Sequence, residues 1–177
     1  MVVAPQDLRD YTVYQIGALW AFARASGTRV QHVKPHGAMY VMASEDDDYA
    51  RAVVEAAAEV DPELIILLRG EAVANAARAS GVRFVPEGYV DVDYAPDGSL
   101  VLSGARRTPE PAAVAARAVR LIAGGTATAT DGSELAVPAR SICIHGDRSN
   151  AVEIARTVRE ALVAAGVDVV PLADVCF

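Results

Sequence analysis

Residues 64–70 read Leu64-Ile65-Ile66-Leu67-Leu68-Arg69-Gly70, a continuous apolar run that closes on a polar residue and a glycine. A short apolar run of this kind is typical of a strand that is buried on both faces of a parallel sheet. Around it, helical and extended patterns alternate along the chain with short connections, and this alternation indicates parallel βα units. The stretch and its surroundings therefore predict an α/β fold.

We expect five helices and five strands. The helical segments carry apolar residues at helical spacing, and glycine, proline or an acidic run marks several of their ends. They cover residues 5–26, 46–60, 71–80, 109–123 and 149–165. The strand segments are short and apolar, and they cover residues 29–33, 64–68, 82–85, 141–144 and 167–170. Between these segments, the turn signals Pro96-Asp97-Gly98 and Asp131-Gly132 predict two hairpins.

The composition is that of a globular protein. The chain has 177 residues, of which 53% are hydrophobic and 22% are charged, and its mean hydropathy is +0.24. A chain of this length buries about 70% of its unfolded surface, which is enough for one sizeable core. These values exclude a disordered tail, a collagen-like repeat and a disulfide scaffold. We expect a single domain over residues 1–177.

The charge balance and the cysteines bear on partners and location. Sixteen basic and 23 acidic side chains give a net charge of −7. We therefore expect no nucleic acid and no membrane as a partner, because both attract positive surfaces. No apolar run is long enough to span a bilayer, and we see no export signal. The two cysteines, Cys143 and Cys176, have no metal-ligand spacing, which favours a reducing cytoplasmic location.

Four predicted strands end in the same way, on a polar residue followed by glycine. The four ends are residues 33–37, 67–70, 84–88 and 142–147. Because sites in parallel βα proteins lie at the carboxyl ends of strands, we expect the polar side chains to converge. These side chains are His36, Arg69, Glu87 and His145, with Lys34 and Asp147 beside them. The alternative is that glycine only starts each turn and the polar residue is its solvated rim.

The residue types at these ends suit proton transfer and anion binding. Histidine titrates near neutral pH, so His36 and His145 can carry protons or bind a metal. Glu87 and Asp147 can act as acid or base, or hold a cation. Lys34 is the only lysine in the chain, which indicates a need for a compact charge facing phosphate or carboxylate. The P-loop, the dinucleotide-binding glycine fingerprint and the nucleophile elbow are absent from the sequence.

Four segments resemble motifs of the LamB/YcsF family. Residues 33–40 (V-K-P-H-G-A-M-Y) are similar to the family's V-K-P-H-G-A-L-Y, and residues 14–19 (Y-Q-I-G-A-L) to its Y-Q-[ILV]-G-A-L. Residues 87–94 and 97–101 resemble its E-x-F-A-D-R-x-Y and D-G-[ST]-L-V segments. Residues 142–147 (I-C-I-H-G-D) resemble I-C-V-H-G-D. The motifs follow in the same order, so the resemblance covers nearly the whole chain.

The resemblance implies a fold, a reaction and a set of residues. The fold would be a seven-stranded βα barrel of the glycoside hydrolase/deacetylase type. The reaction would convert 5-oxo-L-proline, ATP and water to L-glutamate, ADP and phosphate, with Mg²⁺ and two partner subunits, B and C. The implied catalytic residues are Lys34, His36, Glu87, Asp91, His145 and Asp147. ATP would be bound by Lys34, Arg69, Gly37 and Gly146, and no residue is assigned as a metal ligand.

The chain also departs from the family pattern. The family's opening segments, D-L-N-x-D-x-G-E, N-x-A-C-G-F-H-A-G-D and G-A-H-P, do not occur, and Val92 stands where the family has arginine. We therefore expect an N-terminally truncated and incomplete barrel with about five strands. Its first and last strands would present open edges to other chains.

Two other functions compete with that of a 5-oxoprolinase component. The chain could be a non-catalytic remnant that still binds the partner subunits, which the missing segments favour. It could instead be a deacetylase-like hydrolase in which His36, Glu87 and His145 bind a divalent metal.

Overall fold

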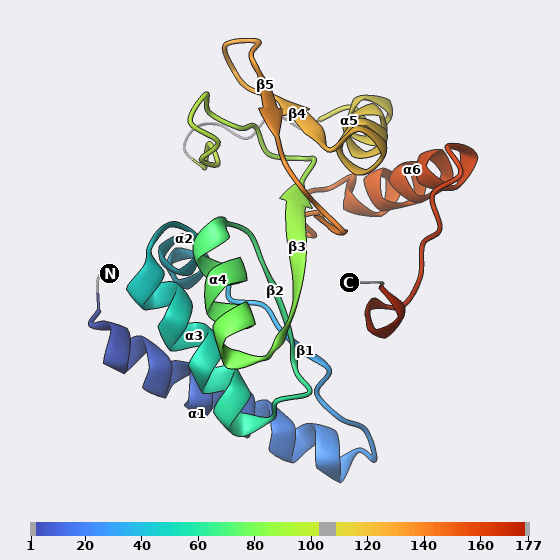
Figure 1. The fold of residues 1–177 in the computed structure, drawn as a ribbon. Coiled ribbons are helices and arrows are strands. Elements are labelled where there is room, and N and C mark those ends of the chain that lie inside the picture. The colour runs from blue at the N-terminus through green and yellow to red at the C-terminus, as the bar shows by residue number, and fades with distance from the viewer. Residues whose placement is uncertain (1–2, 103–108, 176–177) are drawn as a thin grey trace. The chain divides into compact units, whose positions relative to one another are not determined.

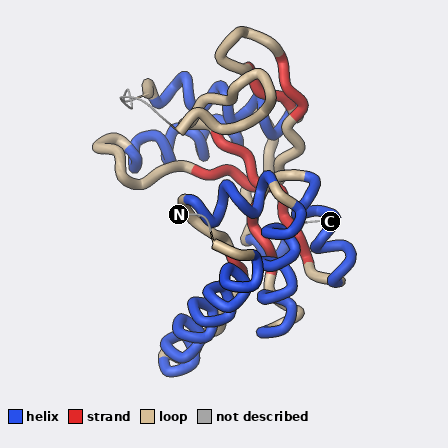
Figure 2. Tube along the Cα trace, turned by 90° about the vertical axis from the view of Figure 1, so that its left-hand side faces the viewer, coloured by secondary structure: helices blue, strands red, loops and turns tan. Residues whose placement is uncertain are grey.

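The structure is a computed structural model that describes residues 3–102 and 109–175. These residues form two compact units, and the division falls between Pro86 and Glu87. Helices make up most of both units and the strands are short (Figure 2). Parallel strands alternate with helices along the chain, so the predicted α/β class is confirmed. None of the described helices is long and apolar enough to cross a membrane.

Unit 1, residues 1–86, contains four helices and the strands β1 and β2 in its described part (Figure 1). Its elements are α1 (Pro5–Ala25), β1 (His32–Val33), α2 (Ala38–Glu45), α3 (Asp47–Val60), β2 (Ile65–Leu68), α4 (Glu71–Ser80) and the first part of β3 (Arg83–Tyr89). β2 lies between β1 and β3 and is parallel to both. Helix α3 packs against α1, α2 and α4.

The core of unit 1 is built around β2. All four of its residues are buried, and Ile65, Ile66 and Leu68 are completely inaccessible to solvent. Val53 and Val54 on α3 are equally buried. The continuous apolar run therefore does form a strand that is covered on both faces, as predicted.

The helices of unit 1 follow the predicted pattern with one addition. Helix α3 begins after Asp46, whose carboxylate accepts hydrogen bonds from the backbone N–H groups of Asp48 and Tyr49 at 2.9 and 3.2 Å. The acidic run thus caps a helix N-terminus, as expected. Helix α2 was not predicted. It follows Gly37, which has no side chain to cap it, and its packing against α3 and α4 supports it.

Unit 2, residues 87–177, holds the remaining strands and helices. Its elements are the second part of β3, α5 (Pro111–Gly124), β4 (Thr126–Thr128), β5 (Glu134–Ala136), β6 (Ser141–Cys143), α6 (Ala151–Ala164) and a 3₁₀ turn (Leu172–Asp174). β6 runs parallel to the second part of β3, with Glu87 opposite Ser141. α5 packs against α6, and Leu121 and Ile154 are among the most buried side chains between them.

Both predicted hairpin turns are present in the described part of the chain. β4 and β5 form an antiparallel hairpin around Asp131-Gly132. There the Ser133 hydroxyl and N–H donate to Asp131, which lowers the pKa of that carboxyl. The other turn closes at Pro96-Asp97-Gly98, where Gly98 N donates to Ala95 O at 2.9 Å.

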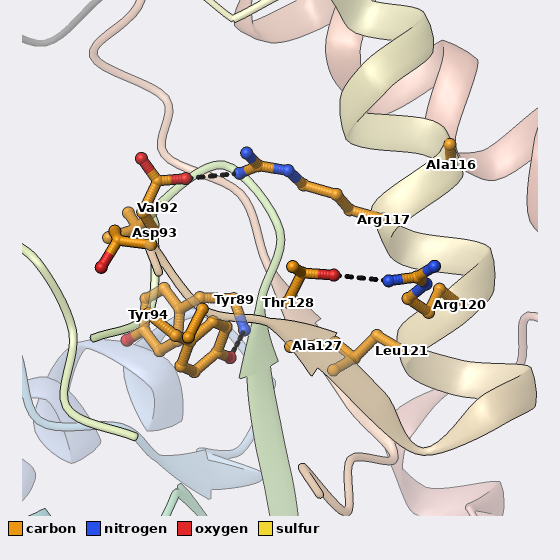
Figure 3. Close-up of a pocket in the computed structure, with 12 residues that line it drawn as sticks. Tyr89, Val92, Asp93, Tyr94, Ala116, Arg117, Arg120, Leu121, Ala127 and Thr128 are labelled. Atoms are coloured by element: carbon orange, nitrogen blue, oxygen red, sulfur yellow. Dashed lines mark hydrogen bonds and ion pairs between the residues drawn. The ribbon is translucent and has the colours of Figure 1, made fainter. Parts of the chain in front are cut away.

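A pocket of about 500 Å³ opens in unit 2 between α5, β4 and the segment that follows β3 (Figure 3). Its lining residues come from 89–94, 116–121 and 127–130. Val92, which stands where the family motif has arginine, is one of them.

The prediction of a fifth strand at residues 167–170 was wrong. These residues have no strand structure, and Val169 and Val170 are exposed. A strand needs a neighbour for its backbone hydrogen bonds, and this segment has none among the described residues. The described parallel strands are four, in the order β1-β2-β3-β6. β1 and β6 each have one partner among them, so the described strands do not close a barrel.

Candidate functional site

Asp91 and His145 lie together just beyond the ends of β3 and β6 in unit 2. The His145 backbone N–H donates to Asp91 Oδ2 at 2.8 Å. Its ring nitrogen Nδ1 lies 3.0 Å from Oδ1 and 3.1 Å from Oδ2 of the same carboxylate. The two strands pair in parallel, so their carboxyl ends bring together residues that are 54 positions apart in the chain.

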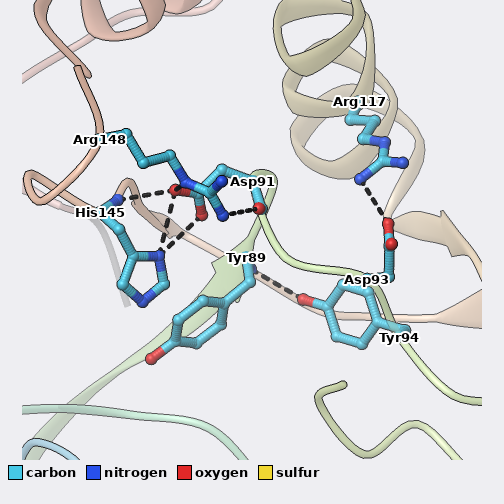
Figure 4. A network of polar contacts seen from close by, with 7 residues as sticks. All are labelled: Tyr89, Asp91, Asp93, Tyr94, Arg117, His145 and Arg148. Atoms are coloured by element: carbon cyan, nitrogen blue, oxygen red, sulfur yellow. Dashed lines mark hydrogen bonds and ion pairs between the residues drawn. The ribbon is translucent and has the colours of Figure 1, made fainter. Parts of the chain in front are cut away.

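Arg148 and Tyr89 hold this pair in place (Figure 4). Arg148 Nη2 donates to the Asp91 carbonyl oxygen at 2.9 Å, and its Nε lies 3.6 Å from Asp91 Oδ2. The Tyr89 ring packs against the His145 ring, with the ring centres 5.7 Å apart. The Asp91 side chain is fully buried and the Arg148 side chain is 10% exposed. The guanidinium therefore supplies the charge that a buried carboxylate needs.

The arrangement leaves one nitrogen of the imidazole for chemistry. Because the carboxylate only accepts hydrogen bonds, Nδ1 carries the proton in the neutral ring. Nε2 then carries a lone pair, and Figure 4 shows it pointing away from Asp91. The His145 side chain is 27% exposed, so a small molecule can reach it. Such a dyad can accept a proton from water and return it to a leaving group.

The other predicted residues of unit 2 occupy different environments. Glu87 was expected just beyond its strand, but β3 continues through Tyr89, so Glu87 lies within the strand and is 3% exposed. The strand was expected to stop at Val85, and its β pattern continues because β6 pairs with the added residues. Gly146 and Asp147 lie in the exposed turn after His145.

The predicted residues of unit 1 lie in two neighbouring strand-to-helix connections. Lys34, His36 and Gly37 join β1 to α2, and Gly37 is the N-cap of that helix. Arg69 joins β2 to α4. Since β1 and β2 pair in parallel, these connections leave the same edge of the unit. Lys34 and Arg69 are partly exposed and His36 is exposed.

Gly70 shows why glycine follows one of these polar residues. Its φ is +101°, and a Cβ added there would lie 2.4 Å from the carbonyl oxygen of Ser44 at the end of α2. Any side chain would push the two segments apart. This glycine serves the close packing of α2 against the start of α4, a role that the structure supports without a ligand.

The described carboxylates do not form a metal-binding group. Both carboxylate oxygens of Asp91 already interact with His145. Within residues 3–102 and 109–175, no three or more His, Cys, Asp or Glu side chains are placed to hold a metal ion. Of the cysteines, Cys143 lies in β6 and Cys176 is outside the described residues.

Sequence reasoning missed Arg148 and Tyr89. Arg148 directly follows the His145-Gly146-Asp147 segment, so its place at a strand end was a usable signal. Tyr89 had no comparable signal, because its contact with His145 depends on the pairing of β3 with β6.

The fold and the strand-end dyad define an α/β protein with a polar site beyond its parallel strands, and comparison with solved structures agrees. The crystal structure of the lactam utilization protein from Thermus thermophilus matches with a TM-score of 0.81 and 39% identity. The match covers 96% of this chain and 68% of that one. The LamB/YcsF family model matches residues 1–176. This chain belongs to the LamB/YcsF family.

Curated relatives share one name. The 5-oxoprolinase A subunit of Nocardia farcinica is 47% identical over 167 residues, which cover 93% of this chain and 67% of that protein. The protein of the same name from Pyrococcus furiosus is 39% identical over 180 residues, covering 98% of this chain and 69% of that protein. The chain thus spans about two thirds of the length of these relatives. Because they are named as one lettered subunit, the enzyme in those organisms has more than one.

Proposed function

We propose that this chain serves as the A subunit of an ATP-dependent 5-oxoprolinase, which opens 5-oxo-L-proline to L-glutamate in the cytoplasm with partner subunits B and C. The observation that carries the proposal is the Asp91–His145 dyad, with Nδ1 held by a buried carboxylate and Nε2 directed away from it. The relatives named as the A subunit of 5-oxoprolinase support the choice of reaction.

The chemistry of a lactam explains why such a dyad is useful. A five-membered cyclic amide is a poor electrophile, and phosphorylation of its oxygen by ATP makes that oxygen a leaving group. Water can then attack the ring carbon if a base takes its proton. In our proposal His145 Nε2 accepts that proton, Asp91 stabilises the resulting imidazolium, and Arg148 keeps the Asp91 carboxylate charged and in place.

We assign the remaining predicted residues to anion binding and water positioning. Lys34 and Arg69 would supply positive charge to the phosphate groups, and Gly37 would let the N-terminus of α2 face them, where backbone N–H groups favour anions. Gly146 would give similar backbone access at the turn after β6.

His36, Glu87 and Asp147 would donate to the oxyanion or order water. ATP and Mg²⁺ enter this scheme as substrates from solution, because the described carboxylates offer no metal-ligand group.

A second function rests on the open sheet edges. β1 and β6 each pair with one strand in the described residues. An unpaired strand edge can hydrogen-bond to another chain. A chain of this kind could hold subunits B and C without turning over substrate, in which case the Asp91–His145 dyad would have no effect on its function.

The test compares catalysis with assembly. The chain is co-purified with subunits B and C from the same genome, and glutamate formation and 5-oxoproline-dependent ADP release are measured. His145→Gln and Asp91→Asn should each lower the rate at least about 100-fold, the usual effect of losing a general base. His32→Gln and Asp131→Asn, both at exposed positions away from the dyad, serve as controls and should keep the wild-type rate.

Two results would contradict the catalytic proposal. One is an unchanged rate in His145→Gln. The other is a wild-type complex that assembles with B and C but shows no 5-oxoproline-dependent ADP release, which would favour the second function.

A further inference from the structure

The pocket in unit 2 has no part in the dyad chemistry, yet it gathers opposite charges in an unusual ratio. Among its described lining residues, the charged ones are Arg117, Arg120 and Asp93. Two cations face one anion here, whereas the whole chain carries a net charge of −7. The pocket is therefore a locally positive hollow in an acidic protein, and such hollows concentrate anions.

The two arginines are placed to act together. They lie three residues apart on α5, so both project from the same face of the helix. Figure 3 shows them reaching from α5 across the pocket, Arg117 to Asp93 and Arg120 to Thr128. Arg117 Nη1 lies 2.9 Å from Asp93 Oδ1, and Arg120 Nη1 donates to the Thr128 hydroxyl. The Arg117 and Asp93 side chains are 53% and 55% exposed, so their ion pair contributes little to stability.

The wall opposite the arginines is apolar and firmly held. Tyr94 is 4% exposed, and its hydroxyl accepts a hydrogen bond from Tyr89 N at 2.8 Å. The Tyr94 carbonyl oxygen accepts from Thr130 N at 2.9 Å, and Asp93 O accepts from Val101 N at 2.9 Å. Backbone bonds on both sides thus fix the segment that carries the tyrosine ring. A fixed wall lowers the entropy cost of binding a ligand.

From these contacts we infer that the pocket is a binding site for a small phosphate monoester with an apolar body. The guanidinium groups of Arg117 and Arg120 would hold the phosphate, because a guanidinium matches two phosphate oxygens at once. The hydroxyls of Thr128 and Thr130 can donate to the remaining oxygens. Tyr94 and Leu121 would cover the apolar body. The volume of about 500 Å³ is in the range of metabolite sites.

Asp93 gives the site a built-in competitor. In the structure its carboxylate occupies Arg117, and an incoming phosphate must displace it. Removal of that carboxylate should therefore tighten binding. A purely structural ion pair makes the opposite prediction, since its loss would leave ligand binding unchanged or weaker. This inference does not depend on the 5-oxoprolinase proposal, because binding is measured on the chain alone.

Calorimetric titration of the full chain with phenyl phosphate tests the site, with inorganic phosphate and benzoate as comparison probes. Phenyl phosphate should bind best, because inorganic phosphate lacks the apolar body and benzoate carries only one charge. The double variant R117Q/R120Q should weaken binding at least about tenfold, since two charge-assisted contacts are lost. Asp93→Asn should tighten it about two- to fivefold, as expected for removing one exposed competing charge.

The matched control is R156Q/R159Q, which removes two arginines with the same spacing on α6 and outside the pocket. It should bind phenyl phosphate like the wild type. Equal circular dichroism spectra and melting temperatures establish that both double variants are folded. The inference is overturned if the wild type shows no saturable binding at millimolar phenyl phosphate, if both double variants weaken binding equally, or if Asp93→Asn weakens it.

Discussion

The two units hold their strand-end residues in different ways. In unit 2, the Asp91 carboxylate is fully buried and fixed by hydrogen bonds from His145 and an ion pair with Arg148. In unit 1, His36 is exposed and Lys34 and Arg69 are partly exposed, in connections between strands and helices. Unit 1 instead buries its apolar strand β2.

This difference separates residues that are set in position from residues that can adapt. A buried charge network fixes side-chain geometry before any ligand arrives, which suits proton transfer. Long side chains at a partly exposed edge can adjust to a ligand, which suits the binding of anions. The comparison therefore supports the division of roles that we propose, with proton transfer in unit 2 and anion binding in unit 1.

The largest effect should come from breaking the buried network. Asp91→Ala leaves Arg148 as a buried charge without its carboxylate, and we expect a loss of about 3–5 kcal/mol in the free energy of unfolding. Asp147→Ala, in the exposed turn nearby, should cost less than about 1 kcal/mol. Urea unfolding followed by circular dichroism measures both. Similar losses in the two variants would show that burial does not distinguish these carboxylates.

A cavity in β2 should rank next. Ile66→Ala removes atoms from a completely buried position in unit 1, and we expect a loss of about 2–5 kcal/mol. Val169→Ala, at an exposed position in the segment that was predicted to be a strand, should change stability by about 0.5 kcal/mol or less. The same urea unfolding experiment measures both, and a large loss at Val169 would mean that residues 167–170 do pack in solution.

The smallest of these effects separates the glycines at two strand ends. Gly70→Ala meets both a positive φ and the Ser44 carbonyl oxygen, and we expect a loss of about 1–3 kcal/mol. Gly146→Ala adds a Cβ with no described atom within 4 Å, and its stability should stay within about 0.5 kcal/mol of the wild type. Differential scanning calorimetry is sensitive enough for both, and equal melting temperatures would contradict the close approach of α2 to α4.

Local patterns predicted the parts of the fold that local forces decide. The apolar run of β2, the acidic cap of α3 and the turn at Asp131-Gly132 all carry their own signals. Residues 167–170 have the same apolar character as a strand but lack a neighbour in the described chain, and pairing depends on distant residues. Helix α2 was missed because it has no cap signal and is supported by packing against α3 and α4.

The candidate site was predicted in part for the same reason. His145 has a local motif and a reactive side chain, so the strand-end pattern identified it. Asp91 entered through the family resemblance, since a lone aspartate after a strand says nothing about its partner. Arg148 and Tyr89 matter because β3 and β6 pair, which is information from the fold. That Lys34, His36 and Arg69 act at one site with the dyad stays a prediction.

The protonation of the His145 ring tests the central claim most directly. Nitrogen-15 NMR of the histidine rings in the full chain distinguishes the two neutral tautomers, and His145→Gln assigns the signal. At a pH where ordinary imidazole is neutral, our account predicts a proton on Nδ1, where Asp91 accepts it, and a lone pair on Nε2. Asp91→Asn should abolish this preference. A wild-type ring with its proton on Nε2 would contradict the account, because His145 could not then act as the base.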